Sequence, residues 1–339
     1  MTTESKPVNL ALQGGGAHGA FTWGVLDRLL EDGRIIFEGV SGTSAGAMNA
    51  VLLADGLMQG GADGARRLLH DFWRDVSRAA MASPLQRSPL SMFMGSWSLD
   101  DSLGYLFMDM LSRVASPYDL NPLNINPLAD IIASHVDFDR VRACTKTKLF
   151  ISATNVHTGR VRVFDTAEIT ADTVMASACL PFLFQAVEID GVPFWDGGYM
   201  GNPALFPFFN ACATEDILLV QINPIERVHT PKTAREIMNR MNEITFNASL
   251  MKEFRAIDFV SRLIDDGKLS EDHYKHVRLH RIAGDREMVD LSASSKMNAE
   301  WEFLTWLRDL GRDTASAWLA AHYDAVGNEA SVDLRALFD

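Results

Sequence analysis

Cysteine is scarce in this 339-residue sequence, and the few cysteines present are not arranged as pairs. Cys144, Cys179 and Cys212 are scattered through apolar or strand-like surroundings, and no CxxC motif occurs. Three cysteines cannot all pair within one chain. We therefore expect buried, reduced thiols, which suit a cytoplasmic location.

Basic residues are also in short supply. Lys and Arg total 31 against 44 Asp and Glu, which gives a net charge of -13 at pH 7. Nucleic-acid binding needs a basic surface that neutralises phosphates, so this charge balance argues against a nucleic-acid partner. It also argues against docking onto anionic membranes by charge alone. Any transient contact with a membrane or lipid surface would have to be apolar and local.

Long hydrophobic runs are absent. No stretch of 18 or more apolar residues occurs, so the sequence predicts no membrane-spanning helix. The apolar run before the first glycines is too short for the core of a signal peptide. Hydrophobic residues nevertheless make up 47% of the chain and charged residues 22%, a balance that predicts a globular protein with a sizeable core.

The first sixty residues alternate between strand and helix patterns. Val8–Gln13 predicts a buried strand, and Ala20–Leu30 places its leucines on one helical face. Ile35–Ser41 predicts a second strand, followed by a helix over Ala47–Leu57. This alternation predicts a parallel sheet with helices on both faces. Further downstream we expect strands at Lys148–Thr154, Val161–Asp165, Val187–Trp195, Ile217–Asn223 and His276–Ala283, and helices at Ile169–Cys179, 231–266 and Trp301–Tyr323.

The segment 81–127 differs from the rest of the chain because it is rich in proline, methionine and aromatic residues. One interpretation is a helical insertion that packs a small core of its own. The other is a flexible apolar cap over a lipid site, since methionine and aromatic side chains form adaptable apolar surfaces. The sequence leaves both open.

A glycine-rich turn follows the first predicted strand. It reads Gly14-Gly15-Gly16-Ala17-His18-Gly19 and precedes a predicted helix. Glycines allow backbone N–H groups to point toward one place, and a helix N-terminus adds positive potential there. The turn can therefore hold an anion, either a phosphate group or the oxyanion that develops during acyl transfer.

The next junction between strand and helix carries a GxSxG motif, Gly42-Thr43-Ser44-Ala45-Gly46. Its two glycines permit the sharp turn that lifts a serine nucleophile clear of the sheet. A serine nucleophile needs a base, and Asp196 ends a later predicted strand, followed by two glycines. Ser44 and Asp196 are therefore the candidate nucleophile and base.

Four segments together resemble the patatin-like phospholipase family. In order they are LQGGGAHGAF at 12–21, GVSGTSAGAMNA at 39–50, ASACLPFLFQ at 176–185 and WDGGYMGNP at 195–203. The resemblance covers about Val8 to Asn223 and weakens beyond Pro224. It implies a three-layer α/β/α sandwich with a central, mostly parallel sheet, a helical cap insertion and a helical C-terminal layer.

The resemblance also implies a catalytic apparatus. Ser44 would be the nucleophile, and Asp196 would act on it directly as general base, with no histidine between them. The backbone amides of Gly14, Gly15 and Gly16 would form the oxyanion hole. The implied activity is that of a serine lipid acyl hydrolase of the phospholipase A or esterase type, which works through an acyl-enzyme in lipid metabolism.

His18 departs from the family pattern, because many bacterial members carry Arg or Lys at this position. Histidine is neutral over part of the physiological pH range, and we expect His18 to contact the substrate or to position the glycine loop. The family uses no metal for its chemistry and no organic cofactor, and nothing in the sequence suggests either. The expected partner is a lipid or another acyl-ester substrate.

The expected domain organisation follows the resemblance. Residues 1–225 would form the catalytic domain, with the cap inserted at about 81–127. Residues 226–339 would form a helical C-terminal extension packed on the same domain.

Three alternatives use the same motifs. Gly14-x-Gly16-x-x-Gly19 fits a dinucleotide-binding turn, with Glu38 near the expected acidic position. A lipid-binding protein with an inactive site would keep the fold, although both candidate catalytic residues are present. An α/β-hydrolase with a Ser-Asp-His triad fits the chain order, because five histidines follow Asp196: His229, His273, His276, His280 and His322.

Overall fold

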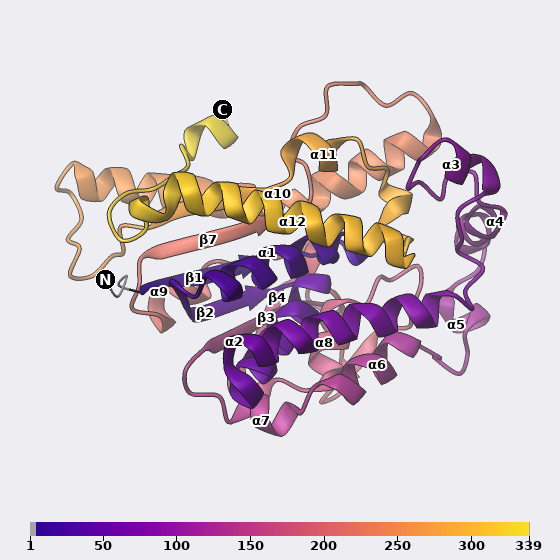
Figure 1. The fold of residues 1–339 in the computed structure, drawn as a ribbon, viewed down its shortest axis with the longest axis horizontal. Helices are drawn as coiled ribbons and strands as arrows, with labels where there is room; N and C mark the ends of the chain where they lie inside the picture. Colours follow the sequence, from indigo (N-terminus) through magenta and orange to yellow (C-terminus); the bar gives the residue numbers. More distant parts are fainter. Residues whose placement is uncertain (1–4, 339) are drawn as a thin grey trace.

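The computed structural model describes residues 5–338 of the chain. A mixed sheet lies between helices on both faces, as Figure 1 shows. Its eight strands are β1 (Lys6–Leu12), β2 (Ile35–Gly42), β3 (Lys148–Asn155), β4 (Val161–Asp165), β5 (Val187–Ile189), β6 (Val192–Asp196), β7 (Asp216–Gln221) and β8 (Arg278–Ala283).

The strand order is β5-β6-β3-β2-β1-β7-β8, and β4 pairs with β3 outside this path. Strands β3, β2, β1, β7 and β8 are all parallel to one another. Strands β4 and β6 run antiparallel to β3. The predicted α/β class with a mostly parallel central sheet is therefore confirmed.

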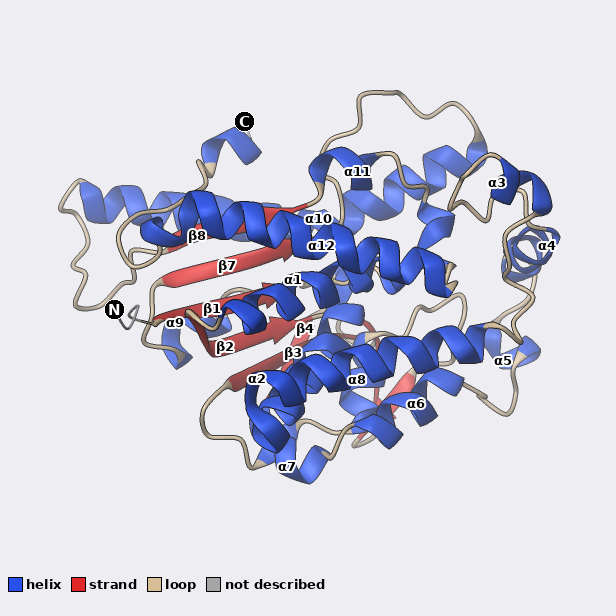
Figure 2. Ribbon diagram, in the orientation of Figure 1, coloured by secondary structure: helices blue, strands red, loops and turns tan. Residues whose placement is uncertain are grey.

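Helices cover both faces of the sheet (Figure 2). They are α1 (Gly19–Asp32), α2 (Ala45–Ala80), α3 (Pro89–Phe93), α4 (Leu103–Ser112), α5 (Pro117–Leu120), α6 (Pro127–His135), α7 (Phe138–Arg142), α8 (Ala171–Ser177), α9 (Pro207–Ala211), α10 (Ala234–Asp265), α11 (Asp285–Val289) and α12 (Trp301–His322).

The side-chain alternation of the strands builds two cores, one on each face of the sheet. Leu10 and Leu12 of β1 are buried in the larger core with residues from α1, α2 and α12. Ala11, between them in sequence, points to the opposite face and packs in the core beneath α9 and α10. This is the period of two expected for a strand that is buried on both sides.

One predicted strand differs from the structure, and one predicted helix is followed directly by a second. The expected strand Val187–Trp195 is a hairpin of β5 and β6, because Asp190 and Gly191 both have positive φ and turn the chain between them. The helix predicted over Ala47–Leu57 corresponds to the first part of α2, because α2 joins two helices across Gly60 and Gly61, whose φ and ψ are not helical. The two glycines accommodate the kink, and the chain resumes its helix beyond them.

The C-terminal region contributes to the same layers as the rest of the chain. Strand β8 extends the sheet beside β7 in parallel. Helix α12 packs along α1 on one face, while α10 contributes Leu250, Phe254 and Ile257 to the core on the other. A helical C-terminal layer was predicted, and the structure confirms it.

The segment 81–127 does not form a core of its own. None of the residues of α4 is buried. Leu103 of this helix is 85% exposed, and Phe93 of α3 is 87% exposed. Of the two interpretations left open, the self-packed insertion is therefore the less consistent with the structure. In the described part of the chain, no helix has the length and apolar character needed to cross a membrane.

Candidate active site

The sheet register brings the three sequence motifs to one edge. Leu12 of β1 pairs with Gly42 of β2, so the glycine-rich turn and the GxSxG turn leave the sheet side by side. Gly42 in turn pairs with Ile151 of β3. Ala153, two residues further along β3, pairs with Asp196 at the end of β6. The register therefore places Asp196 at the same end of the sheet as Gly42, where the turn that carries Ser44 leaves β2.

Ser44 lies at the turn from β2 into α2 in a strained backbone conformation. Its φ is 55° and its ψ is -122°, a region that residues other than glycine rarely adopt. A Cβ atom at Gly46 would come within 2.2 Å of the Leu12 carbonyl oxygen, so only glycine fits where the helix start meets β1. This geometry is the nucleophile elbow that the GxSxG motif predicts.

The segment 176–185 supports this elbow. The Ser44 backbone N–H donates to the Ser177 hydroxyl at 2.9 Å. The Thr43 hydroxyl donates to the Gly201 carbonyl at 2.7 Å, so the segment after Asp196 also supports the turn. The four motifs quoted from the sequence thus meet around one serine.

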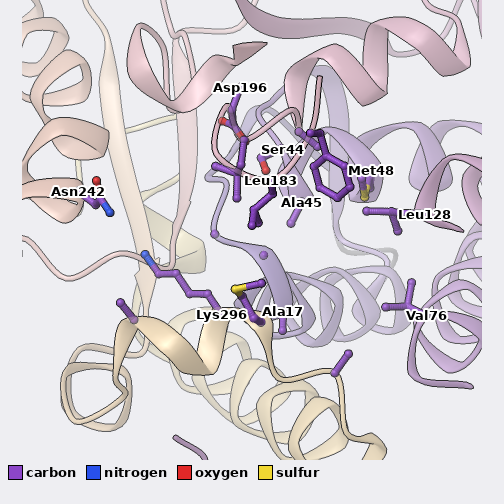
Figure 3. A pocket seen from close by; sticks show the side chains of 18 of the residues that line it. Ala17, Ser44, Ala45, Met48, Val76, Leu128, Leu183, Asp196, Asn242 and Lys296 are labelled. Atoms are coloured by element: carbon purple, nitrogen blue, oxygen red, sulfur yellow. The ribbon is translucent and has the colours of Figure 1, made fainter. Parts of the chain in front are cut away.

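Asp196 is completely buried beside the elbow. Its Oδ1 accepts a 2.7 Å hydrogen bond from the Gly198 amide. Its Oδ2 has no full hydrogen bond within the described part of the chain. The carboxylate faces the Ser44 hydroxyl (Figure 3), which is near enough to lower the Asp196 pKa. The structure therefore brings together the two residues that the sequence singled out.

The pKa of Asp196 is set by opposing effects. Burial raises it, because a charged carboxylate loses the solvation of water. The Gly198 amide, the Ser44 hydroxyl and the Lys296 ammonium lower it. The resulting pKa of about 7 leaves the carboxyl poised between its two protonation states near neutral pH.

The three glycines of the loop differ in their surroundings. The Gly14 N–H donates to the Asn202 side-chain oxygen at 2.7 Å, and its carbonyl accepts from the Asn223 side chain at 2.6 Å. Gly15 and Gly16 line the cavity beside Ser44. The Gly14 amide therefore already has an acceptor within the protein, whereas Gly15 and Gly16 lie beside the proposed reaction centre.

His18 lies behind the glycine loop and does not line the cavity. It is buried, and its Nε2 lies 2.7 Å from the Ser295 hydroxyl. Burial and the charges of Lys296 and Arg227 hold the His18 pKa well below its ordinary value. The structure therefore places His18 where it can position the loop, and it does not place the side chain against a substrate.

A cavity of about 460 Å³ opens beside Ser44 and Asp196. Figure 3 shows Met48, Val76 and Leu128 on one side of Ser44, with Lys296 and Asn242 on another. The cavity is thus apolar on the side of α2 and α6, whereas α10 and the segment around Lys296 contribute polar side chains. Its other apolar lining includes Phe72, Trp73, Leu85, Tyr105, Leu180, Phe182 and Phe246.

The alternative interpretations find no support in this geometry. Among residues 5–338 no histidine lines the cavity, so the geometry offers Asp196 no histidine partner for a triad there. Glu38 accepts hydrogen bonds from the backbone of Ala213 and Thr214, just before β7 begins. It therefore lies at the opposite edge of the sheet from the glycine turn, where it could not bind a nucleotide ribose. Among the described residues, no cluster of three or more His, Cys, Asp or Glu could hold a metal.

Sequence reasoning missed several residues that build this site. Asn202 lay inside a quoted motif, but nothing marked its side chain as the acceptor for Gly14. Asn223 and Lys296 carried no motif. Lys296 belongs to the 3₁₀ helix η4 (Ala293–Met297), which follows the last strand and reaches the glycine loop only through the fold.

Several solved structures are similar to this chain. Among solved structures, VipD from Legionella pneumophila is similar with a TM-score of 0.44 and 18% identity over 94% of this chain and 67% of its own. The type III effector ExoU is similar with a TM-score of 0.34 and 14% identity over 94% of this chain and 54% of its own. The chain thus spans between half and two thirds of these proteins.

A third solved structure, the ExoU–SpcU complex from Pseudomonas aeruginosa, matches with a TM-score of 0.32 and 18% identity over 99% of this chain and 66% of its own. A comparison with curated proteins gives no match. The family model described as patatin-like phospholipase matches residues 10–209, which is more than half of the chain and includes every motif described above. The chain belongs to the patatin-like phospholipase family of lipid hydrolases.

Proposed function

We propose that this chain is a serine lipid acyl hydrolase in which Ser44 and Asp196 form a catalytic dyad. The observation that carries the proposal is the buried Asp196 carboxylate facing the Ser44 hydroxyl at a nucleophile elbow, within one apolar cavity. The family membership supports a lipid substrate. A dyad suffices because a carboxylate with a pKa of about 7 can accept a proton near neutral pH.

The reaction would proceed in two steps. In the first, Asp196 Oδ2 takes the Ser44 proton while the serine oxygen attacks the ester carbonyl carbon. The tetrahedral oxyanion then collapses, the bond to the leaving alcohol breaks, and the alcohol takes the proton from Asp196. In the second, Asp196 removes a proton from water, the resulting hydroxide attacks the acyl-serine, and Ser44 is released with its proton restored.

The backbone amides of Gly15 and Gly16 would stabilise the oxyanion. Both residues line the cavity beside Ser44, whereas the Gly14 amide is engaged by Asn202. Fixed donors aimed at a developing negative charge contribute strongly, since removal of one typically lowers kcat about a hundredfold to a thousandfold. Gly14 and His18 would then position the loop without meeting the substrate.

The cavity lining supports an acyl chain on one side of the serine. Met48, Val76 and Leu128 form an apolar wall next to Ser44. A cavity of this volume lies within the usual range for sites that bind small molecules. We therefore assign the α2 and α6 side to the acyl chain and the α10 side, with Asn239 and Asn242, to the alcohol part of the ester.

We further propose a transient, peripheral contact with a lipid surface. Exposed apolar side chains project from α3, α4 and α10, and α4 and α10 also line the cavity. We name this set the apolar rim. With a net charge of -13, the chain favours zwitterionic or neutral lipids over anionic ones. The rim consists of Leu90, Met92, Phe93, Met94, Leu103, Phe107, Met110, Ile237, Met238, Met241 and Ile244.

We also propose a cytoplasmic location. Cys144, Cys179 and Cys212 are all free thiols buried in the fold. Buried reduced thiols are typical of proteins in reducing compartments.

An activity panel tests the proposed function directly. Wild type, Ser44→Ala and Asp196→Asn would be assayed on p-nitrophenyl esters and on defined phospholipids. A fluorophosphonate probe would measure labelling of the serine in parallel. Loss of hydrolysis in both variants and loss of labelling in Ser44→Ala are expected. Full activity of Ser44→Ala on every substrate would overturn the proposal.

A further inference from the structure

The glycine loop is supported from the C-terminal region by Lys296. The Lys296 ammonium donates to the Asn223 side-chain oxygen at 2.6 Å. The Asn223 side-chain amide donates in turn to the Gly14 carbonyl at 2.6 Å. Lys296 thus reaches Gly14 through a single intervening side chain, and Asn223 is itself buried directly after β7.

The backbone of the same 3₁₀ helix packs against the loop. Gly16 has a φ of +60°, and a Cβ atom there would lie 2.4 Å from the Lys296 carbonyl oxygen. No side chain could be tolerated at Gly16 without moving one of the two segments. The loop and η4 therefore hold each other in place through their backbones as well as through Asn223.

His18 is neutral, so it does not supply a positive charge beside the glycine loop. The Ser295 hydroxyl donates to the Ser292 carbonyl at 2.7 Å, so it must accept from His18 Nε2–H. The remaining ring nitrogen, Nδ1, is buried without a partner among the described residues. Burial and the nearby Lys296 and Arg227 charges keep the His18 pKa low, so the imidazole is neutral.

Lys296 also acts on the catalytic carboxylate through its charge. It lines the cavity and lowers the pKa of Asp196. Burial lowers the pKa of Lys296 below its ordinary value; among the nearby charges, Glu243 and Asp196 raise it and Arg227 lowers it. Glu243 is tied to Arg227 by a 2.6 Å ion pair, so its charge is largely balanced.

We infer that Lys296 is the positioning residue of the oxyanion loop: through Asn223 it fixes Gly14 so that the Gly15 and Gly16 amides point into the cavity. This inference rests on the function proposed above. It assigns the C-terminal region a direct part in the active site. It also explains how the loop functions with a neutral histidine at position 18.

The test compares two variants that separate the hydrogen-bond link to Gly14 from the effect of the Lys296 charge on Asp196. Lys296→Met removes the charge and the hydrogen bond while keeping a long side chain, whereas Asn223→Ala removes the link between Lys296 and Gly14 and keeps the charge. Lys268→Met, at an exposed lysine paired with Asp266, serves as the control. Each would be assayed on a neutral p-nitrophenyl ester and a short-chain phosphatidylcholine across pH, with thermal melting to verify folding.

We expect Lys296→Met to lower kcat by the same factor on both substrates, about tenfold to a hundredfold, with little change in KM. The acid limb of its kcat/KM profile should move to higher pH, because Asp196 loses a neighbouring cation. Asn223→Ala should lower kcat similarly and leave the acid limb in place. Lys268→Met should match wild type.

Three outcomes would overturn the inference. The first is a rise in KM confined to phosphatidylcholine, which would make Lys296 a phosphate-binding residue. The second is a lower melting temperature with an unchanged kcat and pH profile, which would make its role purely structural. The third is wild-type kinetics of Lys296→Met on substrates whose hydrolysis is abolished by Ser44→Ala. The proposed function would then stand, and Lys296 would have no part in it.

Discussion

The backbone amide of Gly14 donates a 2.7 Å hydrogen bond to the side chain of Asn202, which lies six residues beyond Asp196. The bond joins the glycine loop after β1 to the segment that carries the carboxylate at the end of β6. Thr43, next to the nucleophile, donates to Gly201 in the same segment. The proposed nucleophile, base and oxyanion loop are therefore joined through hydrogen bonds to one segment, so a shift of that segment would displace all three.

Asn202→Ala tests this coupling. The substitution leaves the buried Gly14 N–H without an acceptor, so the loop should shift to find one. We expect kcat to fall about tenfold to a hundredfold, since misplaced oxyanion donors lose most of their effect. Asn210→Ala, on an exposed asparagine of α9, should retain full activity. An Asn202→Ala enzyme with wild-type kcat would show that Gly14 needs no support from this side.

The pH dependence of hydrolysis follows from the Asp196 pKa of about 7. The proposed base must be ionised, so kcat/KM should rise with pH and level off above pH 7. At pH 5 the rate should be about a hundredfold below the plateau, because only about one carboxyl in a hundred is then ionised. A stopped assay with a soluble ester from pH 4.5 to 9 measures this limb. A flat profile over that range would argue against Asp196 as the base.

The parts of the fold predicted from sequence were those with local signals. The elbow at Ser44 follows from glycines on both sides of the serine, and its strand and helix follow from apolar periodicity. The hairpin at Asp190 and Gly191 also had a local signal, since a DG pair between apolar residues favours a two-residue turn. An unbroken strand over Val187–Trp195 was therefore an avoidable error.

The contacts that complete the site had no such signal. Lys296 and Asn223 stand in unremarkable sequence, 73 residues apart, and meet only because η4 folds back onto the glycine loop. The pairing of Gly14 with Asn202 likewise depends on sheet register across β1, β2, β3 and β6. Long-range side-chain contacts of this kind depend on the tertiary fold, and periodicity or motif spacing does not encode them.

The apolar rim predicts binding to zwitterionic vesicles. Phe93→Ser and Leu103→Ser alter side chains that are 87% and 85% exposed and do not line the cavity. We expect the double variant to partition into phosphatidylcholine vesicles at least tenfold more weakly, since each large apolar side chain contributes about 1.5–3 kcal/mol when fully buried. Its activity on a soluble ester should be unchanged.

The control for this experiment is Ile36→Ser, which removes an exposed apolar side chain at the start of β2, away from the rim. Vesicle co-sedimentation of the three proteins measures the difference. Equal partitioning of all three would show that the rim does not meet lipid. Binding that strengthens with added anionic lipid would contradict the charge argument.

Glu253 of α10 gives a stability prediction that is independent of catalysis. Its carboxylate accepts hydrogen bonds of 2.8 and 2.9 Å from the Leu205 and Phe206 amides. Burial outweighs these bonds and raises its pKa from 4.5 to about 7. Because the folded state holds this proton more tightly, the unfolded chain ionises first as the pH rises. The Glu253 contribution to stability therefore declines between about pH 4.5 and 7 and stays low above.

Glu253→Gln should remove this decline. A glutamine oxygen can accept from both amides, and it carries no charge to desolvate at high pH. We expect the urea midpoint of the variant to exceed that of wild type at pH 8 and to match it near pH 5, while the exposed Glu271→Gln shows no such difference. A midpoint for Glu253→Gln below wild type at both values would mean that the ionised carboxylate stabilises the fold, and that its two amide bonds outweigh burial.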